Sequence, residues 1–333
     1  MQKHLGLSVL DQSPISEGST GADALRHTID LAGLADRLGY RRYWSAEHHG
    51  TPMLASAAPE VMIAEIAATT ERIRVGSGGV MLPHYSPLKV AETFSMLGGL
   101  HPGRIDLGIG RAPGSDRSTM VALQRDRRQL APDDFPDQLA ELLAYFENAF
   151  PPNHPLARLA ALPGAPGTAD LWLLGSSPQS AIWAGELGLP YSLADFINPT
   201  GSQNARLYRE RFQPSRRRTE PEVMVSVAAI AADTDEEAER LASSVRMAIT
   251  LLRLGRPVPV PPVETARAFL AETDASVAGD RRLVVGSPST VRAGLEEVAA
   301  EYQADELMIV TITHSHEARR RSYELVAAAF ELD

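Results

Sequence analysis

Short apolar runs alternate with longer stretches of helical spacing along almost the whole chain, and the runs predict eight strands. The runs cover residues 5–10, 43–46, 73–75, 105–109, 171–174, 189–193, 223–230 and 307–312. The helical stretches cover residues 21–38, 59–69, 87–97, 136–149, 178–187, 203–212, a segment from about 234, and 317–330. Eight strand–helix units in succession predict parallel strands covered by helices.

A closed (β/α)8 barrel, or TIM barrel, is the arrangement that eight units in a chain of 333 residues favour. The alternative is an open doubly wound sheet, which usually carries a glycine-rich turn after its first strand. The sequence at that point is Asp11-Gln12-Ser13-Pro14 and contains no glycine. We therefore predict one barrel domain over residues 1–333, with its active site at the C-terminal ends of the strands.

The interval between predicted strands seven and eight is too long for one crossover connection. Residues 255–262 are rich in proline and cannot continue a helix. Residues 263–270 can form a short helix, and residues 276–282 are polar. We predict that residues 255–282 are an insertion that acts as a lid over the site; the alternative is a passive surface excursion.

The charge and composition of the chain exclude several classes of function. A net charge of −10 argues against a nucleic-acid-binding protein, which would need a basic face. The absence of cysteine excludes disulfides, thiolate metal sites and cysteine nucleophiles. No apolar run reaches the length of a membrane span and the N-terminus does not resemble a secretory signal, so we expect a cytoplasmic protein without a membrane partner.

The tripeptide Glu47-His48-His49 follows the second predicted strand, where a TIM barrel places its catalytic side chains. We assign no metal here, because neighbouring strand residues point to opposite faces and no further ligands have suitable spacing. Two interpretations remain open. These side chains cap the loop through hydrogen bonds to backbone, or a histidine donates to a developing anion or moves a proton near neutral pH.

Glycine-containing segments end the third and fourth predicted strands. The first, Gly76-Ser77-Gly78-Gly79, either lets the backbone approach a flat ligand or forms a plain turn. The second, Gly108-Ile109-Gly110-Arg111, lacks the glycine spacing of a dinucleotide fingerprint. It leaves Arg111 at a strand end, where it is suited to a phosphate or carboxylate or is simply solvated.

The segment Gly175-Ser176-Ser177-Pro178-Gln179-Ser180 joins strand five to its helix. Hydroxyls and free amides at a helix N-terminus can bind an anion, whereas N-capping by Ser176 or Ser177 needs no ligand. Because strands four and five are neighbours in the predicted barrel, Arg111 and this helix start would lie at the same end. Together they would form a phosphate cradle.

These residues resemble those of the bacterial luciferase-like flavin monooxygenases over essentially the whole chain. The matching segments are WSAEHH at 44–49, RVGSGGVMLP at 74–83, HPGR at 101–104 with LGIGR at 107–111, residues 183–190, and AADTDEEA at 231–238. Their order and spacing carry the resemblance. It points to small single-component members near the alkanal-monooxygenase-like group.

The resemblance implies that reduced flavin mononucleotide (FMN) binds at the C-terminal end of the barrel and reacts with O2. His48 corresponds to the histidine required for productive oxygen chemistry, and His49 stands beside it. Gly78 and Gly79 correspond to a pair joined by a non-prolyl cis peptide against the flavin ring. Small residues fit that role because a non-prolyl cis bond costs roughly 3 to 4 kcal/mol and leaves little room for side chains.

The resemblance also implies a site for the flavin phosphate. Arg111 corresponds to the phosphate-binding arginine, and Ser177 and Ser180 correspond to hydroxyl positions around the phosphate. Two positions depart from the light-emitting members: Gly110 replaces a reactive cysteine beside the flavin, and Ser176 replaces a glutamate. Both replacements leave flavin binding intact and argue against light emission and a long-chain aldehyde substrate.

We therefore predict a flavin-dependent monooxygenase that uses reduced FMN and O2 on a small organic substrate. The chain shows no nicotinamide-binding domain, so a separate flavin reductase would supply the reduced FMN. The resemblance further implies a homodimer paired through exterior helices. The alternatives are an oxidoreductase that uses the deazaflavin F420, and a non-catalytic flavin-binding protein.

Overall fold

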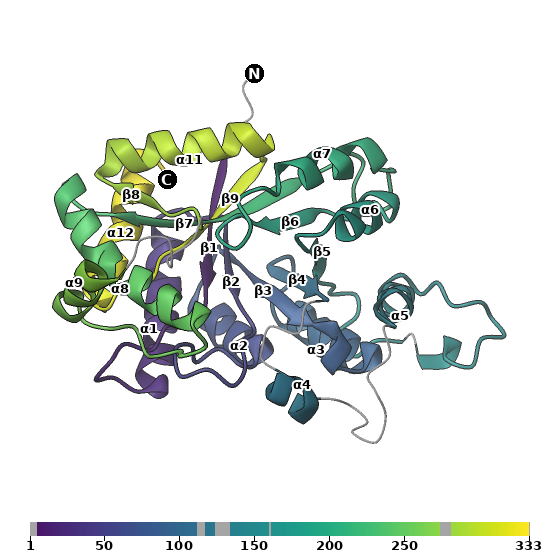
Figure 1. The fold of residues 1–333 in the computed structure, drawn as a ribbon. Coiled ribbons are helices and arrows are strands. Elements are labelled where there is room, and N and C mark those ends of the chain that lie inside the picture. Colours follow the sequence, from purple (N-terminus) through teal and green to yellow (C-terminus); the bar gives the residue numbers. More distant parts are fainter. Residues whose placement is uncertain (1–4, 112–116, 124–133, 160, 274–280, 333) are drawn as a thin grey trace.

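The computed structural model describes residues 5–111, 117–123, 134–159, 161–273 and 281–332, and its strands form a closed parallel barrel (Figure 1). The barrel strands are β1 (Gly6–Asp11), β2 (Arg42–Ser45), β3 (Arg74–Met81), β4 (Ile105–Gly110), β5 (Asp170–Leu174), β6 (Tyr191–Ala194), β7 (Val223–Ala231) and β9 (Glu306–Val310). Strands β6 and β7 pair with each other, and β9 pairs with both β7 and β1, which closes the ring. The predicted TIM barrel is confirmed.

Helices cover the outside of this barrel (Figure 1). The predicted ones are α1 (Gly21–Arg37), α2 (Pro59–Thr69), α3 (Pro87–Leu100), α5 (Phe135–Glu147), α6 (Pro178–Glu186), α7 (Ser202–Arg211), α8 (Asp235–Arg253) and α12 (His316–Ala329). The Thr234 side chain caps α8 by accepting from the Glu237 amide at 3.2 Å, but the Glu237 carboxylate pairs with Arg240 and does not complete a capping box. None of the described helices has the length and apolarity that crossing a bilayer requires.

Two short elements, α4 (Arg117–Leu123) and the 3-10 turn η2 (Ala157–Leu159), lie between the predicted strands and helices, and the 3-10 turn η1 (Leu82–His84) follows β3. The interval between β7 and β9 differs more from the prediction. It contains α8, α9 (Val263–Glu272), the strand β8 (Val284–Gly286) and α11 (Pro288–Tyr302). Strand β8 lies outside the barrel and pairs with the last three residues of β7.

The predicted insertion at 255–282 contains α9, as expected, while its residues 274–280 lie outside the described part of the chain. Its proline-rich start is extended and fixed to the barrel. The Val260 amide donates to the Ile15 carbonyl at 2.8 Å, and the Glu17 amide donates to the Val260 carbonyl at 2.8 Å. Val260 itself is fully buried. The proline-rich start of the predicted insertion is therefore anchored to the barrel at Val260.

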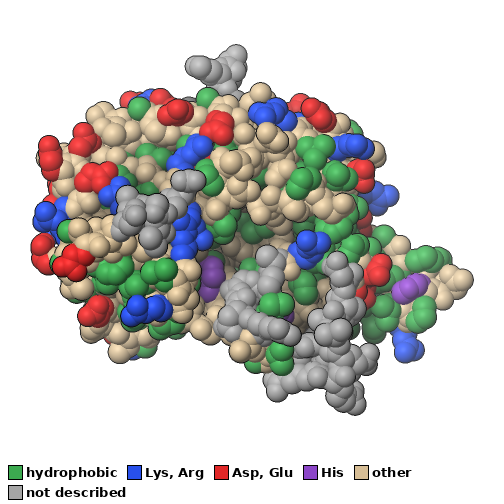
Figure 2. Space-filling view, in the orientation of Figure 1, with side chains coloured by type: hydrophobic (Ala, Val, Ile, Leu, Met, Phe, Trp, Pro, Cys, Tyr) green, Lys and Arg blue, Asp and Glu red, His purple; other side chains and the backbone are tan. Residues whose placement is uncertain are grey.

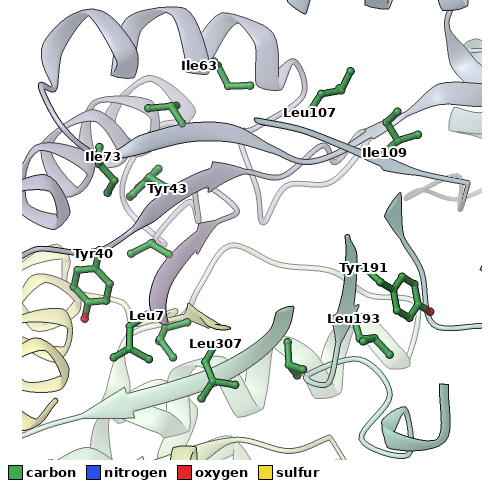
Figure 3. Close-up of a cluster of buried hydrophobic side chains, with 14 of the residues drawn as sticks. Leu7, Tyr40, Tyr43, Ile63, Ile73, Leu107, Ile109, Tyr191, Leu193 and Leu307 are labelled. Atoms are coloured by element: carbon green, nitrogen blue, oxygen red, sulfur yellow. The ribbon is translucent and has the colours of Figure 1, made fainter. Parts of the chain in front are cut away.

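Alternating residues of each strand build two apolar layers. Side chains such as Leu7, Tyr43 and Leu307 point outward and pack under the helices (Figure 3). Their neighbours fill the barrel interior, where Trp44 and Trp172 meet edge to face with ring centroids 5.6 Å apart. Because this layer closes the middle of the barrel, any ligand must enter from one of its ends.

The N-terminal end of the barrel is filled by a buried network of charges. The Arg42 guanidinium donates to Glu306 at 3.1 Å and to Asp106 at 2.9 Å. The Trp44 indole also donates to Asp106 at 2.9 Å, and the Ser8 hydroxyl donates to Glu306. These side chains satisfy one another, so this end is built for stability and the opposite end remains for function.

Candidate active site

A cavity of about 650 Å³ opens at the C-terminal ends of β1, β2, β6, β7 and β9, beneath α8. This volume lies within the range of small-molecule sites. Its walls include Gln12, His48, His49, Thr51, Met53, Leu54, Phe196, Ile197, Val245, Arg246, Ile249, Leu252, Pro257, Arg281, Arg282, Leu283, Val310 and Ile312. The surface in Figure 2 is hollowed near its middle, with histidine and arginine or lysine side chains beside the hollow. The cavity thus combines an apolar lining with a few polar groups.

The three residues of the Glu47-His48-His49 segment have different roles. Glu47 is fully buried and structural. Its Oε2 accepts from the Met81 amide at 3.0 Å, and its Oε1 accepts from the Tyr85 hydroxyl at 2.9 Å. Glu47 thereby links β2 to the end of β3. For this residue the loop-capping interpretation is correct.

His49 is held by that same carboxylate. Its Nε2 lies 2.9 Å from Glu47 Oε1, and its ring meets the His84 ring edge to face at 6.4 Å. With an ionised Glu47, this geometry favours the His49 tautomer that carries its proton on Nε2. His49 lines the cavity with a fixed ring orientation.

His48 has no such partner. Its backbone amide donates to the Ser56 carbonyl at 2.8 Å, but its ring Nδ1 is buried without a hydrogen bond. Burial, and to a smaller extent the charge of His49, lowers the pKa of His48 to about 4. The imidazole is therefore neutral at neutral pH and can accept or donate a proton through an unused ring nitrogen.

Gly78 and Gly79 lie on β3 and are joined by a cis peptide bond, as the sequence comparison predicted. A Cβ on Gly78 would come within 2.5 Å of Leu10 Cδ1, and one on Gly79 within 2.8 Å of the Gly108 carbonyl oxygen. The backbone of β4 therefore demands glycine at position 79, whereas a side chain at position 78 would have to displace the end of the Leu10 side chain. Neither residue is among those that line the cavity.

Gly110 and Arg111 end β4 and stand next to β5, as predicted from the order of the strands. The Arg111 side chain is exposed, and its guanidinium carbon lies 5.9 Å from the centre of the Trp183 ring on α6. A Cβ on Gly110 would meet only Met81 Sδ, at 3.5 Å. Arg111 thus lies beside the helix whose N-terminus was predicted to bind phosphate.

The serines at the start of α6 hydrogen-bond among themselves. The Ser177 hydroxyl caps the helix by accepting from the Ser180 amide at 3.3 Å. The Ser180 hydroxyl donates to the Ser177 carbonyl at 2.7 Å and contacts the Tyr191 hydroxyl at 3.0 Å. Ser176 is exposed, and its carbonyl accepts from Asn204. Ordinary capping is thus present, and it leaves Ser176 and Arg111 open to solvent.

Apart from the three glycines on β3 and β4, the predicted site residues therefore fall into two groups. His48 and His49 line the cavity. Arg111 and the start of α6 form a separate cluster on the neighbouring strands β4 and β5, outside the lining of that cavity.

The sequence analysis missed several residues that the fold brings to this end. Asp195 follows β6 and is fully buried. Its Oδ1 accepts from the Tyr302 hydroxyl at 2.9 Å, whereas Oδ2 has no hydrogen bond and lies 3.6 Å from Arg282 Nε. Burial raises the pKa of Asp195. The rule that polar residues at strand ends are suspect, applied to strand six, would have found it.

Residues 5–306 match the family described as luciferase-like monooxygenase. An Escherichia coli protein named luciferase-like monooxygenase is 42% identical, over 97% of this chain and 96% of that protein. N-acetyl-S-alkylcysteine monooxygenase of Bacillus subtilis is 37% identical over 97% of each chain. The crystal structure of apo-MsnO8 is 42% identical and superimposes with a TM-score of 0.90, covering 100% of this chain and 99% of that one.

Two more distant structures share the fold alone. The oxygenating constituent of 3,6-diketocamphane monooxygenase from Pseudomonas putida, in complex with FMN, has 21% identity and a TM-score of 0.73, with 97% of each chain covered. An F420-dependent secondary alcohol dehydrogenase has 14% identity and a TM-score of 0.63, covering 98% of this chain and 99% of that one. The barrel therefore occurs with either cofactor.

Proposed function

The chain belongs to the luciferase-like monooxygenase family, and from that premise we propose that it is a flavin-dependent monooxygenase. In this proposal it uses reduced FMN and O2 to oxidise a small organic substrate. The observation that carries the proposal is His48: a neutral imidazole with an unpartnered, buried Nδ1 on the wall of a cavity at the C-terminal end of the barrel. A buried polar atom without a partner is costly unless a ligand completes it.

The residues present fit a flavin in two respects. The cavity has room for a flat ring beside His48. Ser176 is exposed just before the N-terminus of α6, and Arg111 is exposed with its guanidinium over Trp183 of the same helix. In this proposal a phosphate would meet both a guanidinium and helix amides. In this proposal Arg111, Ser176, Ser177 and Ser180 hold the phosphate. When bound, reduced flavin would supply the electrons that activate O2, and one oxygen atom would pass to the substrate.

His48 has the central chemical role in this proposal. Its Nδ1 is free to donate a hydrogen bond to an oxygen that gains negative charge, or to pass on a proton. Glu47 fixes the orientation of the His49 ring, and this ring in turn fixes the shape of the cavity wall next to His48. The apolar walls contributed by residues such as Met53, Phe196 and Ile249 exclude water, which strengthens these hydrogen bonds.

Residues 255–282 act as a lid in the same proposal. Gly255, Pro257, Arg281 and Arg282 line the cavity, and Val260 anchors the segment to the barrel. We expect limited proteolysis within this segment to be slowed by reduced FMN and substrate together. Cleavage there at equal rates with and without ligands would make the segment a passive excursion.

We further propose that a separate reductase supplies reduced FMN and that the protein is a homodimer. Helices α2 and α3 leave Val61, Met96 and Leu100 more than half exposed, at 64%, 54% and 70%. Apolar side chains on an outer surface suit pairing of two copies. Sedimentation equilibrium measures this directly, and a monomer at all concentrations would contradict it.

The function is tested by isotope labelling. Chemically reduced FMN, ¹⁸O2 and an N-acetyl-S-alkylcysteine are supplied to the protein, because a relative carries that substrate in its name. We expect a product that contains one ¹⁸O atom, and none with reduced F420 in place of FMN. Oxidation that depends on F420 and incorporates no ¹⁸O would identify a deazaflavin oxidoreductase. Bound flavin without oxidation of any substrate tried would favour a non-catalytic binding protein.

A further inference from the structure

Among the described residues, the lining of the cavity beside His48 contains three arginines, Arg246, Arg281 and Arg282, and no aspartate or glutamate. The pKa of His48 near 4 means that this ring adds no charge at neutral pH. Positive charge in the cavity therefore comes from the arginines on its wall. Which of them are available to a ligand depends on their existing partners.

Two of the three arginines are already paired with acidic residues. Arg246 forms an ion pair with Glu239, about two turns away on the same helix. Arg282 donates to Glu301 at 2.8 Å and has its Nε 3.6 Å from Asp195. Their charges are balanced within the protein, so neither needs a ligand.

Arg281 differs from both. Its side chain is half-buried on the cavity wall and has no hydrogen bond or ion pair with any residue that the structure describes. Burial, and then the neighbouring charge of Arg253, lowers the pKa of Arg281. A partly buried guanidinium without an anion is unfavourable, and a ligand that brings an anion would relieve that cost.

We propose that the substrate is an organic acid, whose carboxylate is bound by Arg281 while its apolar body lies against the cavity walls. The guanidinium fork matches a planar carboxylate through two parallel hydrogen bonds. Leu283, Phe196 and Ile249 offer the apolar surface in the same cavity. This inference rests on the proposed function only in taking the cavity as the place where substrate binds.

The phosphate of FMN is the rival occupant of Arg281. Arg111 is the better candidate for that phosphate because it lies over Trp183 of α6, a helix whose N-terminus can bind an anion. Arg281 has no helix N-terminus among its described contacts and lies three residues before β8 in the chain. The two arginines therefore predict different ligand preferences, which one experiment can separate.

The test measures binding to the flavin-free protein by calorimetry, with three probes that share one apolar body. They are 3-phenylpropanoate, 3-phenylpropanamide and 3-phenylpropylamine, which are negative, neutral and positive at pH 7.5. We expect the wild-type protein to bind the acid at least about tenfold more tightly than the amide, and the amine more weakly still. Arg281→Met should bring the acid to the affinity of the amide. Arg281→Lys should recover part of the preference.

Arg211→Met is the matched control, because Arg211 is an exposed arginine on α7 outside the cavity. It should bind all three probes like the wild type. Each variant's thermal unfolding is recorded, so that loss of folding is told apart from loss of the anion site. FMN and riboflavin are titrated into the same variants, and Arg281→Met should leave the ratio of their affinities unchanged.

Equal binding of acid and amide by the wild-type protein, or no binding of the acid, contradicts the proposal. So does an Arg281→Met variant that keeps the preference for the acid. Loss of the preference for FMN over riboflavin in Arg281→Met would show that Arg281 holds the flavin phosphate. None of these measurements needs turnover. If the monooxygenase proposal failed, the binding result would therefore still hold, and the two failures could be told apart.

Discussion

Key buried polar side chains at the two ends of the barrel differ in their partners. At the N-terminal end, Arg42 is 2% exposed and is bonded to both Glu306 and Asp106. At the C-terminal end, His48 Nδ1 and Asp195 Oδ2 are buried without a hydrogen bond, and Arg281 has no partner among the described residues. Both ends are rich in ionisable residues, so composition alone does not separate them.

The difference separates stability from function. A charge network that satisfies itself holds the strands together and leaves nothing for a ligand to complete. Unsatisfied groups cost stability in the free protein and are retained where a ligand supplies the missing partner. The comparison predicts that substitutions at the N-terminal end change stability and that those at the C-terminal end change chemistry or binding.

The largest effect is expected from Arg42→Met. It removes the buried cation that Glu306 and Asp106 share. Only their more exposed partners, Arg41 and Arg74, would remain. We expect the free energy of unfolding to fall by about 3 to 5 kcal/mol. Chemical denaturation measures it, with Arg26→Met as control, because the exposed ion pair of Arg26 with Asp23 should contribute little to stability. If Arg42→Met lowered the free energy of unfolding no more than Arg26→Met does, the charge network at the N-terminal end would not stabilise the fold.

The corresponding substitution at the C-terminal end is His48→Ala, which should change chemistry more than stability. We expect product formation to fall by about 10²-fold or more, because the imidazole would no longer move or hold a proton. Oxygen consumption should continue, with the oxygen appearing as hydrogen peroxide, while flavin binding and the unfolding transition stay close to wild type. Peroxide formed per O2 consumed is the quantity to measure. Full product yield in this variant would exclude His48 from the reaction.

Arg111→Ala should weaken FMN by about 10- to 150-fold, the factor that a charge-assisted hydrogen bond of about 1.5 to 3 kcal/mol represents. Riboflavin lacks the phosphate, so its affinity should be nearly unchanged. Fluorescence quenching of the two flavins gives both dissociation constants. Equal losses for FMN and riboflavin would mean that Arg111 acts on folding or on the ring.

The smallest effect concerns acid stability. His48 has a pKa of about 4 in the folded protein and an ordinary value of 6.5 when unfolded. Between these values the unfolded chain binds a proton that the folded one does not, so stability falls as the pH drops from 6.5 to 4. His48→Gln should lose this part of the pH dependence, on the order of 1 to 2 kcal/mol for a partly exposed ring. If the free energy of unfolding depended on pH in the same way in the wild type and in His48→Gln, the His48 ring would be solvated in the folded protein.

Much of the fold could be predicted from the sequence because each barrel strand is a separate apolar run. Strand β8 could not, since it has three residues and exists through pairing with the end of β7. Helix α11 was also missed: it lies between the predicted insertion at 255–282 and the last predicted strand, where no element was predicted. The sequence showed that the interval between predicted strands seven and eight is too long for one crossover. Where its strand and helices begin and end depends on long-range contacts, which a local sequence pattern does not show.

The candidate site was predictable in position and not in detail. His48 and Arg111 were predicted as site residues because polar residues at the C-terminal ends of barrel strands form the active sites of TIM barrels. Which histidine has a partner depends on Glu47, whose other bonds come from Met81 and Tyr85, more than thirty residues along the chain. Arg281 and Arg282 are neighbours in sequence, and only the folded positions of Glu301 and Asp195 make them different.

The central claim is that the C-terminal end of this barrel binds reduced FMN for a reaction with O2. Anaerobic titration of the wild-type protein with reduced FMN and with reduced F420, followed by absorbance and fluorescence, tests it most directly. The account predicts saturable binding of one reduced FMN per chain, at least about tenfold tighter than F420, and loss of that preference for FMN in Arg111→Ala. Tighter binding of F420, or no saturable binding of FMN, would contradict it.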